Sequence, residues 1–578
     1  MASHKSNEAH VNNIVSVTCD MGGRRMEENN GNGWFQLEAK SPLKNTTPLK
    51  STNISKKSPM KEQAKENRRN NKEHITESKL QKEEEIFHRP AVDEKPKRRN
   101  SHEQLTESVT QEETAHQRPS VQSSLKDKHV KGQSNKWEED IPAAFHSQTV
   151  GKRGPVLEQD NILHETLETF VHEKIIERPV HVKGFGAFGY FETMNAMTEY
   201  TKLSFLQNPG QTVPVTVRFS LAVSTKGTPD TSRNVRGFST KFYTDEGIFD
   251  LICNHIPVFS VRDAIRFPES IKAFLPSPKN NLIDPERFWS FVARAPEATH
   301  FVVRIYSDAG TVKSLRHIPG HSVNTYVWRN AQGVRRYLKY RWIPFAGEEY
   351  IDSQEAVKLA GENPDIAGKD LFDTIASGET VEYGLYVQLM NPEDEAKLPF
   401  DPLDDTKVWD EQQYPLMPVG RMVLNRNPDN YMEQVEKIAF SPSNLLEGAE
   451  LSDDKMLQGR ANIYWDSQRR RIGPDFRNIP INHQQEWSPA DLQTSGEGRY
   501  VEGQLVRSDL TKQDDFTQAG QYYQSLSPVG QEHLVNNLAA DLAGISNETR
   551  GIVLNYMYQA SSELGERVKR QIDMQAKR

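Results

Sequence analysis

The sequence predicts an α+β protein with an antiparallel β-barrel core, a wrapping segment after the barrel and a helical C-terminal domain. Three observations support this prediction. Short strand-like runs separated by turn residues recur between residues 212 and 422, which is typical of a sheet that closes into a barrel. Prolines interrupt the stretch that follows. Leucine and valine then return at helical spacing near the C-terminus.

The first part of the chain has a different composition from the rest. Residues 1–135 are rich in Ser, Asn, Gln and Lys and have almost no apolar periodicity, so we expect a disordered polar extension. Residues 44–69 of this extension form a basic run without an aromatic side chain. Such a run could bind nucleic acid, but a solvated tail is the better interpretation because nothing in it can stack on bases.

Two cysteines, Cys19 and Cys253, occur in 578 residues. They provide no disulfide framework, so we expect a reducing compartment and a cytoplasmic location. No apolar run approaches the roughly 18 to 20 residues that cross a bilayer. The start of the chain lacks the apolar core of a signal peptide. We therefore expect no membrane partner.

The predicted elements follow in chain order. Residues 136–181 form an N-terminal arm that includes a short helix over 162–170, and residues 182–425 form the barrel domain. Turn residues at 245–247 and 330–333 separate strand signals. The strands are predicted over residues 213–223, 236–244, 250–255, 300–306, 324–328, 335–342, 381–390 and 421–424.

Residues 426–505 are predicted to wrap around the barrel in an irregular path, and residues 506–578 to form the helical domain. Ser527 and Pro528 are a helix N-cap and first-turn pair. The apolar residues at helical spacing are Leu534, Val535, Leu538 and Leu542, followed by Leu564, Val568 and Ile572.

One predicted strand carries an arginine that needs a partner. Over residues 213–223, apolar side chains point one way, while Arg218 and Ser220 point the other. If that second side is enclosed, Arg218 requires an anion, because an unpaired buried charge is costly. Guanidinium groups suit carboxylates such as haem propionates. The alternative is that Arg218 faces solvent.

Two further motifs indicate peroxide chemistry on a haem. Arg460 and Tyr464 lie four residues apart, so on a helix the guanidinium could keep the phenol deprotonated, as an iron ligand requires. His181 and Asn254 could then move a proton and orient peroxide on the other side. Taken alone, Arg460 and Tyr464 could be a surface contact, and Asn254 a strand-end residue.

Residues 184–189 match the pattern G-x-G-x-x-G. A dinucleotide loop needs a preceding hydrophobic strand and a following helix. Here the motif follows His181-Val182-Lys183 and opens into Tyr190-Phe191-Glu192, so a nicotinamide cofactor is the weaker interpretation.

Together these residues resemble the monofunctional haem catalases, of the small-subunit type, over roughly residues 145–578. The resemblance rests on segments 178–192, 218–220, 254–259, 423–428 and 455–460 and on the spacing of Tyr464, Asp466, Arg471 and Gly473. It implies haem b in a β-barrel, a homotetramer, and hydrogen peroxide as the substrate. The expected activity is dismutation of hydrogen peroxide to water and dioxygen, which protects the cell against oxidative stress.

The resemblance also implies a role for each matching residue. His181 would be the acid-base residue, Asn254 the amide that orients peroxide, Ser220 the partner of the histidine ring and Tyr464 the metal ligand. The cofactor-binding residues would be Arg178, Arg218 and Arg471 at the propionates, Phe267 on the porphyrin, Arg460 beside the axial ligand, and Val180.

Several positions depart from the family pattern. His255, Ser260 and Asn234 replace an asparagine, a phenylalanine and a channel aspartate, and the stretch Arg316 to Asn324 is unusual. Glu411 replaces a histidine that NADPH-binding members use, so tightly bound NADPH is not expected. The channel changes leave open a hydroperoxide isomerase or peroxidase acting on organic hydroperoxides. A third alternative is a non-catalytic haem protein.

Overall fold

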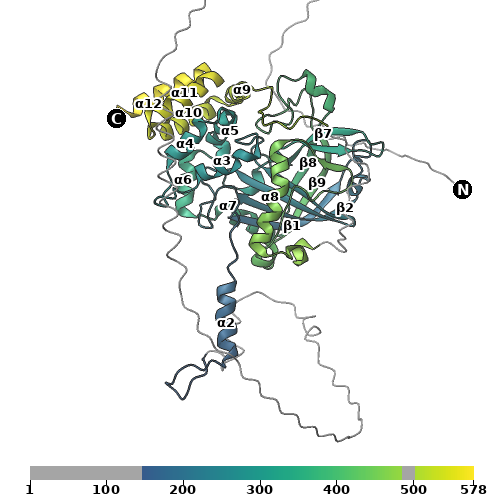
Figure 1. Ribbon diagram of the computed structural model, residues 1–578, viewed down its shortest axis with the longest axis vertical. Helices are drawn as coiled ribbons and strands as arrows, with labels where there is room; N and C mark the ends of the chain where they lie inside the picture. Colours follow the sequence, from purple (N-terminus) through teal and green to yellow (C-terminus); the bar gives the residue numbers. More distant parts are fainter. Residues whose placement is uncertain (1–145, 484–501, 578) are drawn as a thin grey trace, which may run out of the picture. The chain divides into compact units, whose positions relative to one another are not determined.

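The computed structural model describes residues 146–483 and 502–577. Eight of its antiparallel strands close into a ring in the order β7-β5-β4-β3-β2-β1-β9-β8, and the pairing of β7 with β8 completes it (Figure 1). The strands β6 and β10 continue the sheet from β7. The bounds are β1 Gly184–Thr193, β2 Thr212–Leu221, β3 Arg236–Thr244, β4 Gly247–Asn254, β5 Gly320–His321, β6 Tyr326–Arg329, β7 Arg335–Pro344, β8 Val381–Met390, β9 Met417–Arg426 and β10 Ala449–Leu451.

Apolar and aromatic side chains fill the inside of the barrel. Val215, Val217 and Phe219 of β2 belong to a buried cluster with residues from β1, β3, β4 and β6 to β9. Phe238 stacks on Trp342 with ring centres 5.9 Å apart, and each such buried side chain contributes about 1.5–3 kcal/mol. Because the interior is filled, the polar residues of β2 and β4 point to the outer face of the barrel.

The segment after β9 covers part of that outer face. It contains a π-helix over Met432–Glu436 and the long helix α8, Lys455–Ile472 (Figure 1). Asp454 caps α8 by accepting hydrogen bonds from the first-turn amides of Met456 and Leu457. Gly473, with φ of 95°, ends the helix in a backbone conformation that glycine adopts without strain.

The four C-terminal helices pack against α4 and α5 beside the barrel (Figure 1). Ser527 caps α10, and all seven apolar residues predicted to form the helical core are buried. The remaining bounds are α2 Asn161–His172, α3 Phe267–Phe274, α4 Pro285–Ala293, α5 Thr299–Tyr306, α6 Ser353–Glu362, α7 Ile366–Ala376, α9 Thr517–Ser525, α10 Pro528–Ala543, α11 Asn547–Ala560 and α12 Ser562–Gln575.

One predicted strand is wrong. Residues 300–306 lie in α5, and every residue of that helix except Arg304 is buried. A short segment buried all around shows neither a helical nor a strand period, so its Val and Ile residues gave a misleading strand signal. The strand β1 was not predicted, because its glycines are normally disfavoured in strands.

The expected disordered extension, including the basic run at 44–69, lies outside the described residues. Within the described residues, no helix is long and apolar enough to span a bilayer.

Candidate active site

Three residues form one row across neighbouring strands on the outer face of the barrel. Ser220 of β2 pairs with Gly237 of β3, which pairs with Asn254 of β4, so all three face the same side. His181 lies at this row, with Nδ1 3.0 Å from the hydroxyl of Ser220. A Cβ at Gly237 would come within 2.7 Å of that nitrogen. The structure therefore brings His181, Ser220 and Asn254 together, and glycine leaves the space that the ring needs.

The backbone and the surroundings of His181 are both unusual. Its φ is 62°, a left-handed conformation that costs a non-glycine residue about 1–3 kcal/mol. Burial, followed by the charges of Arg218, Arg460 and Arg178, lowers the pKa of His181 to about 3. The ring is therefore neutral at physiological pH, and one ring nitrogen can accept a proton.

Three arginines converge near this row. Arg178 pairs with the carboxylate of Glu436 at 3.2 Å, and both Arg178 and Arg471 donate to the main-chain carbonyl of Glu436, at 2.7 and 2.6 Å. Arg218 and Arg471 are 3% and 4% exposed. The Nε atoms of Arg218 and Arg471 have no hydrogen-bond partner within the described residues. Arg218 donates instead to the carbonyls of His181 and Val182. The charge of the Glu436 carboxylate acts on all three arginines, and additional carboxylates would offset the remaining positive charge.

The lowered pKa values of Arg178 and Arg471 reflect their burial and the neighbouring positive charge. Burial lowers the pKa of Arg178 well below its ordinary value, the charges of Arg218 and Arg471 lower it further, and Glu436 opposes the change. Burial also lowers the pKa of Arg471, to about 10. The guanidinium groups remain charged at neutral pH, so the cluster has the charge needed to attract an anion.

Helix α8 presents Arg460 and Tyr464 to the same outer face. Arg460 Nη2 donates to the phenol oxygen of Tyr464 at 3.1 Å, as the four-residue spacing predicts. Burial lowers the pKa of Arg460, but the fields of neighbouring groups, Tyr464 first, outweigh burial and raise it. Tyr464 packs in a small cluster with Ile252 of β4, which points the same way as Asn254 two residues later. The phenol and the His181 row therefore share one side of the barrel.

Two other predicted residues have fewer contacts that bear on the site. Phe267 begins α3 and stacks on Phe259 with ring centres 6.1 Å apart and planes 21° apart. Val180 is half-buried immediately before His181. Their expected contacts with a porphyrin stay predictions.

The three departures from the family pattern have specific partners. Asn234 holds the main chain of Val223 with two hydrogen bonds, of 3.2 and 2.6 Å. The hydroxyl of Ser260 lies 2.8 Å from that of Ser270. His255 accepts from the amide of Arg236 and donates to the carbonyl of Ala309. Each departing side chain is thus satisfied by local hydrogen bonds.

Gly237, Glu436 and Tyr431 were missed by the sequence reasoning. Tyr431 donates to the carbonyl of Gly184 at 2.9 Å and lies close enough to Arg218 to affect its pKa. The glycine inside strand 236–244 was an available signal, because a strand glycine often marks close approach of another group. No local pattern identified Glu436, whose partners are distant in sequence.

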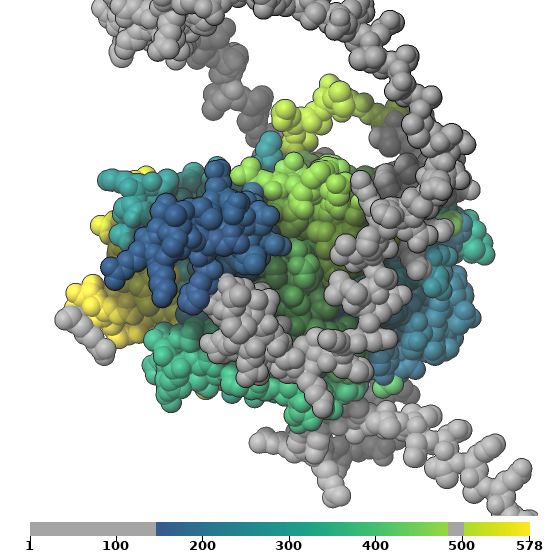
Figure 2. All heavy atoms as spheres, turned by 90° about the horizontal axis from the view of Figure 1, so that it is seen from below, coloured from purple at the N-terminus to yellow at the C-terminus, as the bar shows by residue number. Residues whose placement is uncertain are grey.

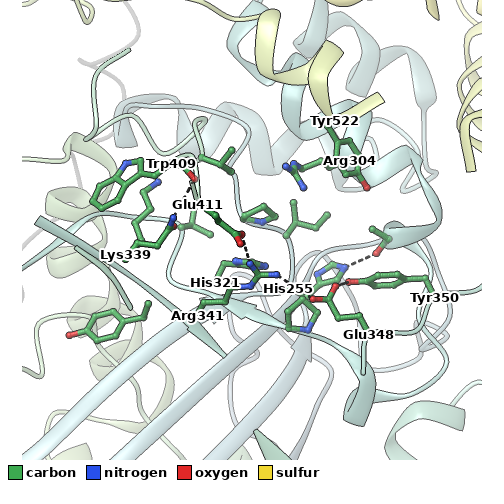
Figure 3. Close-up of a pocket in the computed structure, with 18 residues that line it drawn as sticks. His255, Arg304, His321, Lys339, Arg341, Glu348, Tyr350, Trp409, Glu411 and Tyr522 are labelled. Carbon is green, nitrogen blue, oxygen red and sulfur yellow. Dashed lines mark hydrogen bonds and ion pairs between the residues drawn. The ribbon is translucent and has the colours of Figure 1, made fainter. Parts of the chain in front are cut away.

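A separate pocket of about 250 Å³ is lined in part by His255 (Figure 3). Its charged lining comes from α5, β7 and the loops that follow, including Arg304, Lys339, Arg341 and Glu411. Arg341 reaches across it to Glu411 at 2.7 Å, as the dashed line in Figure 3 shows.

The buried histidines make stability dependent on pH. Burial lowers the pKa of His255 to about 3, against 6.5 in an unfolded chain. Between these values the unfolded chain binds a proton that the folded chain excludes, so this group's contribution to the free energy of unfolding falls as pH falls. The loss is about 1.4 kcal/mol per pH unit.

The His255→Asn variant isolates this contribution, since the substitution removes the titrating ring. Urea unfolding at half-unit steps from pH 6.5 to 4.5 should give the natural sequence the steeper decline. Equal slopes for the two proteins would contradict a neutral His255.

Comparison with known proteins gives consistent matches. The family model described as Catalase matches residues 135–513, and one described as Catalase-related immune-responsive matches 509–572. Catalase isozyme A of Oryza sativa subsp. indica is 38% identical, with 74% of this chain and 93% of the relative covered. Catalase-2 of Bacillus subtilis is also 38% identical, with 75% of this chain and 69% of the relative covered.

Solved structures agree with these sequence matches. A structure of a bacterial catalase superposes with a TM-score of 0.72 and 34% identity, and it covers 78% of this chain and 98% of its own. Catalase A from Saccharomyces cerevisiae gives a TM-score of 0.69 and 33% identity, with 76% and 98% covered. The alternative of an organic-hydroperoxide enzyme is not favoured, because these relatives are named as catalases. The chain is therefore a member of the catalase family, an enzyme that dismutates hydrogen peroxide to water and dioxygen.

Proposed function

We propose that the cofactor is haem b, with Tyr464 as its iron ligand and with its propionates among Arg178, Arg218 and Arg471. Family membership implies a haem. The observation that carries the finer assignment is the group of three arginines around one carboxylate, on the same face as the Tyr464 phenol and the His181 ring. A haem carries two propionates, the number of negative charges that this surplus requires.

The donor set also fits a porphyrin better than a bare metal ion. Among the residues that the structure describes, no three His, Cys, Asp or Glu side chains converge as metal ligands. A single phenol oxygen with an arginine beside it suits ferric iron that a porphyrin would hold. When bound, the haem supplies the electrons that break one peroxide and are recovered from a second.

His181, Ser220 and Asn254 perform the proton chemistry in this proposal. The contact between Ser220 and Nδ1 fixes the ring and leaves Nε2 for peroxide. Because the ring is neutral, Nε2 can take the proton from one peroxide oxygen and return it to the other as the O–O bond breaks. The Asn254 amide orients the peroxide without competing for the proton. Val180 and Phe267 would contact the porphyrin.

Purified protein tests the assignment directly. We expect the absorption spectrum of a ferric haem with a phenolate ligand, together with oxygen release on an electrode when hydrogen peroxide is added. A preparation that stays colourless after incubation with iron protoporphyrin IX would contradict it.

We further propose that this protein does not bind NADPH tightly. In the pocket of Figure 3, Arg341 pairs with Glu411 at 2.7 Å and approaches Glu348 at 3.5 Å. A nucleotide phosphate would have to displace these carboxylates and then lie beside them. We expect calorimetric titration with NADPH to give no saturable heat at micromolar concentrations. Micromolar binding would overturn the proposal.

The proposed assembly is a homotetramer, supported by the arm helix α2. None of its residues is buried within the chain, and the arm lies at the surface in Figure 2 (dark blue). Leu167 and Phe170 are 54% and 67% exposed, and we propose that another copy covers them. Light scattering should give four times the mass of one chain, and Leu167→Glu with Phe170→Glu should lower it. A monomeric natural sequence would contradict the proposal.

The remaining assignments stay predictions with direct tests. A cytoplasmic location is supported by the scarcity of cysteine, and cell fractionation checks it. The expected lack of nucleic-acid binding through residues 44–69 can be checked by gel-shift assays. Protection against oxidative stress can be measured as survival of a deletion strain in peroxide. The small-subunit type stays a prediction. Limited proteolysis should cut near the boundaries after residues 135 and 505 and spare those after 181 and 425, because Val182 and Lys183 are buried and residue 425 lies in β9.

A further inference from the structure

A buried hydrogen-bond chain extends behind the Tyr464 phenol. Arg460 uses Nη2 for Tyr464, at 3.1 Å, and uses Nη1 for a short hydrogen bond to the side-chain oxygen of Asn324. Arg460 is thus held at two points, and the second point decides where its guanidinium plane lies. Asn324 belongs to the stretch before β6 and is 1% exposed.

The orientation of the Asn324 amide is fixed by its neighbours. A guanidinium only donates, so the amide oxygen must face Arg460. The amide nitrogen then faces two carboxyl groups, Asp454 at 2.8 Å and Asp405 at 3.4 Å. Each of the two amide hydrogens has an acceptor, so a flipped amide would lose the contact with Arg460 and set oxygen against oxygen.

The two carboxyl groups have different surroundings. Asp454 is the N-cap of α8 and accepts from the amides of Met456 and Leu457 as well as from Asn324. Asp405 is 1% exposed, and one of its carboxyl oxygens has no hydrogen-bond partner in the described part of the chain. A charged carboxylate in that position would be costly, so Asp405 fits the site as the neutral acid of the pair.

We propose that Asn324 is a positioning residue for the axial phenol, which ties the guanidinium of Arg460 to the buried Asp454–Asp405 pair. This proposal rests on the assignment of Tyr464 as the haem ligand. Asn324 carries no charge itself, so it fixes Arg460 while separating that cation from the two acids. Asp405 supplies the second acceptor for the amide without adding a second negative charge.

The groups around Asp405 also favour its neutral form over its charged form. Burial raises the pKa of Asp405 well above its ordinary value, and the charges of Asp454 and Asp404 raise it further, while Lys339 and Arg460 oppose the change. Lys339 donates to the main-chain carbonyl of Lys407 at 2.9 Å. The net effect of these groups is a raised pKa of Asp405, in line with the unpaired oxygen of its buried carboxyl.

The Asn324→Leu variant of the haem-loaded protein tests the proposal. Leucine has a similar volume and removes both connections, so Arg460 loses its second anchor. We expect a shifted ferric absorption spectrum and haem transfer to excess apomyoglobin that is faster by about tenfold or more, the effect of losing one charge-assisted hydrogen bond. Unchanged spectrum and transfer rate would overturn the proposal.

Asn330→Leu is the matched control. Asn330 is also a buried amide, 8% exposed, but it holds the turn between β6 and β7 through hydrogen bonds to Gln332 and Val334. Its loss should lower the melting temperature and leave both haem readouts unchanged. If Asn330→Leu shifted the spectrum and the transfer rate as much as Asn324→Leu, both effects would be structural and the proposal would fail.

A paired substitution gives a second test. Asn324→Asp keeps the acceptor for Arg460 but brings a third acid against Asp454 and Asp405, so both haem readouts should shift. Adding Asp454→Asn reverses donor and acceptor in the 2.8 Å contact between residues 324 and 454, because Oδ1 keeps the cap of α8 and the new amide nitrogen replaces Oδ2. Both readouts should then return most of the way to those of the natural sequence. No rescue by Asp454→Asn would overturn the proposal. Failure of the natural sequence itself to take up haem would instead refute the assignment of Tyr464.

Discussion

Replacing His181 with alanine should abolish nearly all oxygen release while the protein keeps its haem. The ring lies at the row of Ser220 and Asn254, and its neutral state lets it both accept and return a proton. General acid-base catalysis of this kind contributes about 10²–10⁴-fold to a rate. We therefore expect oxygen-electrode rates to fall by at least about a hundredfold, with little change in the absorption spectrum.

His255→Asn is the matched control for that experiment. His255 is also buried and neutral, but both of its ring nitrogens are used by the main chain of Arg236 and Ala309. The His255→Asn protein should therefore keep most of its oxygen release. If His181→Ala remained fully active, the proposed proton transfer would be wrong.

Replacing Tyr464 with phenylalanine should remove the haem or change its spectrum strongly. The substitution deletes the phenol oxygen and leaves the Nη2 group of Arg460 without its acceptor. A hydrogen bond to a charged group contributes about 1.5–3 kcal/mol, in addition to the proposed bond to iron. Haem content per chain, measured by the pyridine haemochrome method, should fall well below that of the natural sequence.

Tyr383→Phe controls for the loss of any buried tyrosine hydroxyl. Tyr383 is fully buried inside the barrel and donates to the carbonyl of Leu315 at 2.7 Å. Its phenylalanine variant should unfold at a lower temperature and keep both haem and activity. A Tyr464→Phe protein with the haem content and spectrum of the natural sequence would exclude Tyr464 as the ligand.

The local sequence patterns located seven of the ten strands in the described residues, whereas α3, α4, α6 and α7 were not predicted and α8 lies in the segment predicted to be irregular. The strands 236–244 and 381–390 match β3 and β8 to the residue, because turns bound them and β-branched or aromatic residues fill them. The cap formed by Ser527 and the apolar spacing of Leu534 and Leu538 likewise located α10. These signals depend only on neighbours along the chain, which is why a single sequence was enough.

The failures occur where burial or distant contacts override local preference. Residues 300–306 form a helix because the surrounding core buries them on all sides, which removes the period that distinguishes helix from strand. The glycines of β1 are tolerated because they leave room for other groups; a Cβ at Gly184 would lie 2.5 Å from the guanidinium carbon of Arg218. Neither reason can be seen from adjacent residues.

By itself the sequence predicted most of the barrel strands and the apolar spacing of the C-terminal helices, the residue types of the site, and the four-residue spacing that joins Arg460 to Tyr464. Only the tertiary structure decided that Arg178 and Arg471 both bind Glu436, that Gly237 makes room for His181, and that Asn324 links Arg460 to Asp454 and Asp405. The physical reason is range: periodicity and capping act within a few residues, whereas the charge balance and close approach of a buried site depend on side chains that meet from 35 to 258 residues apart.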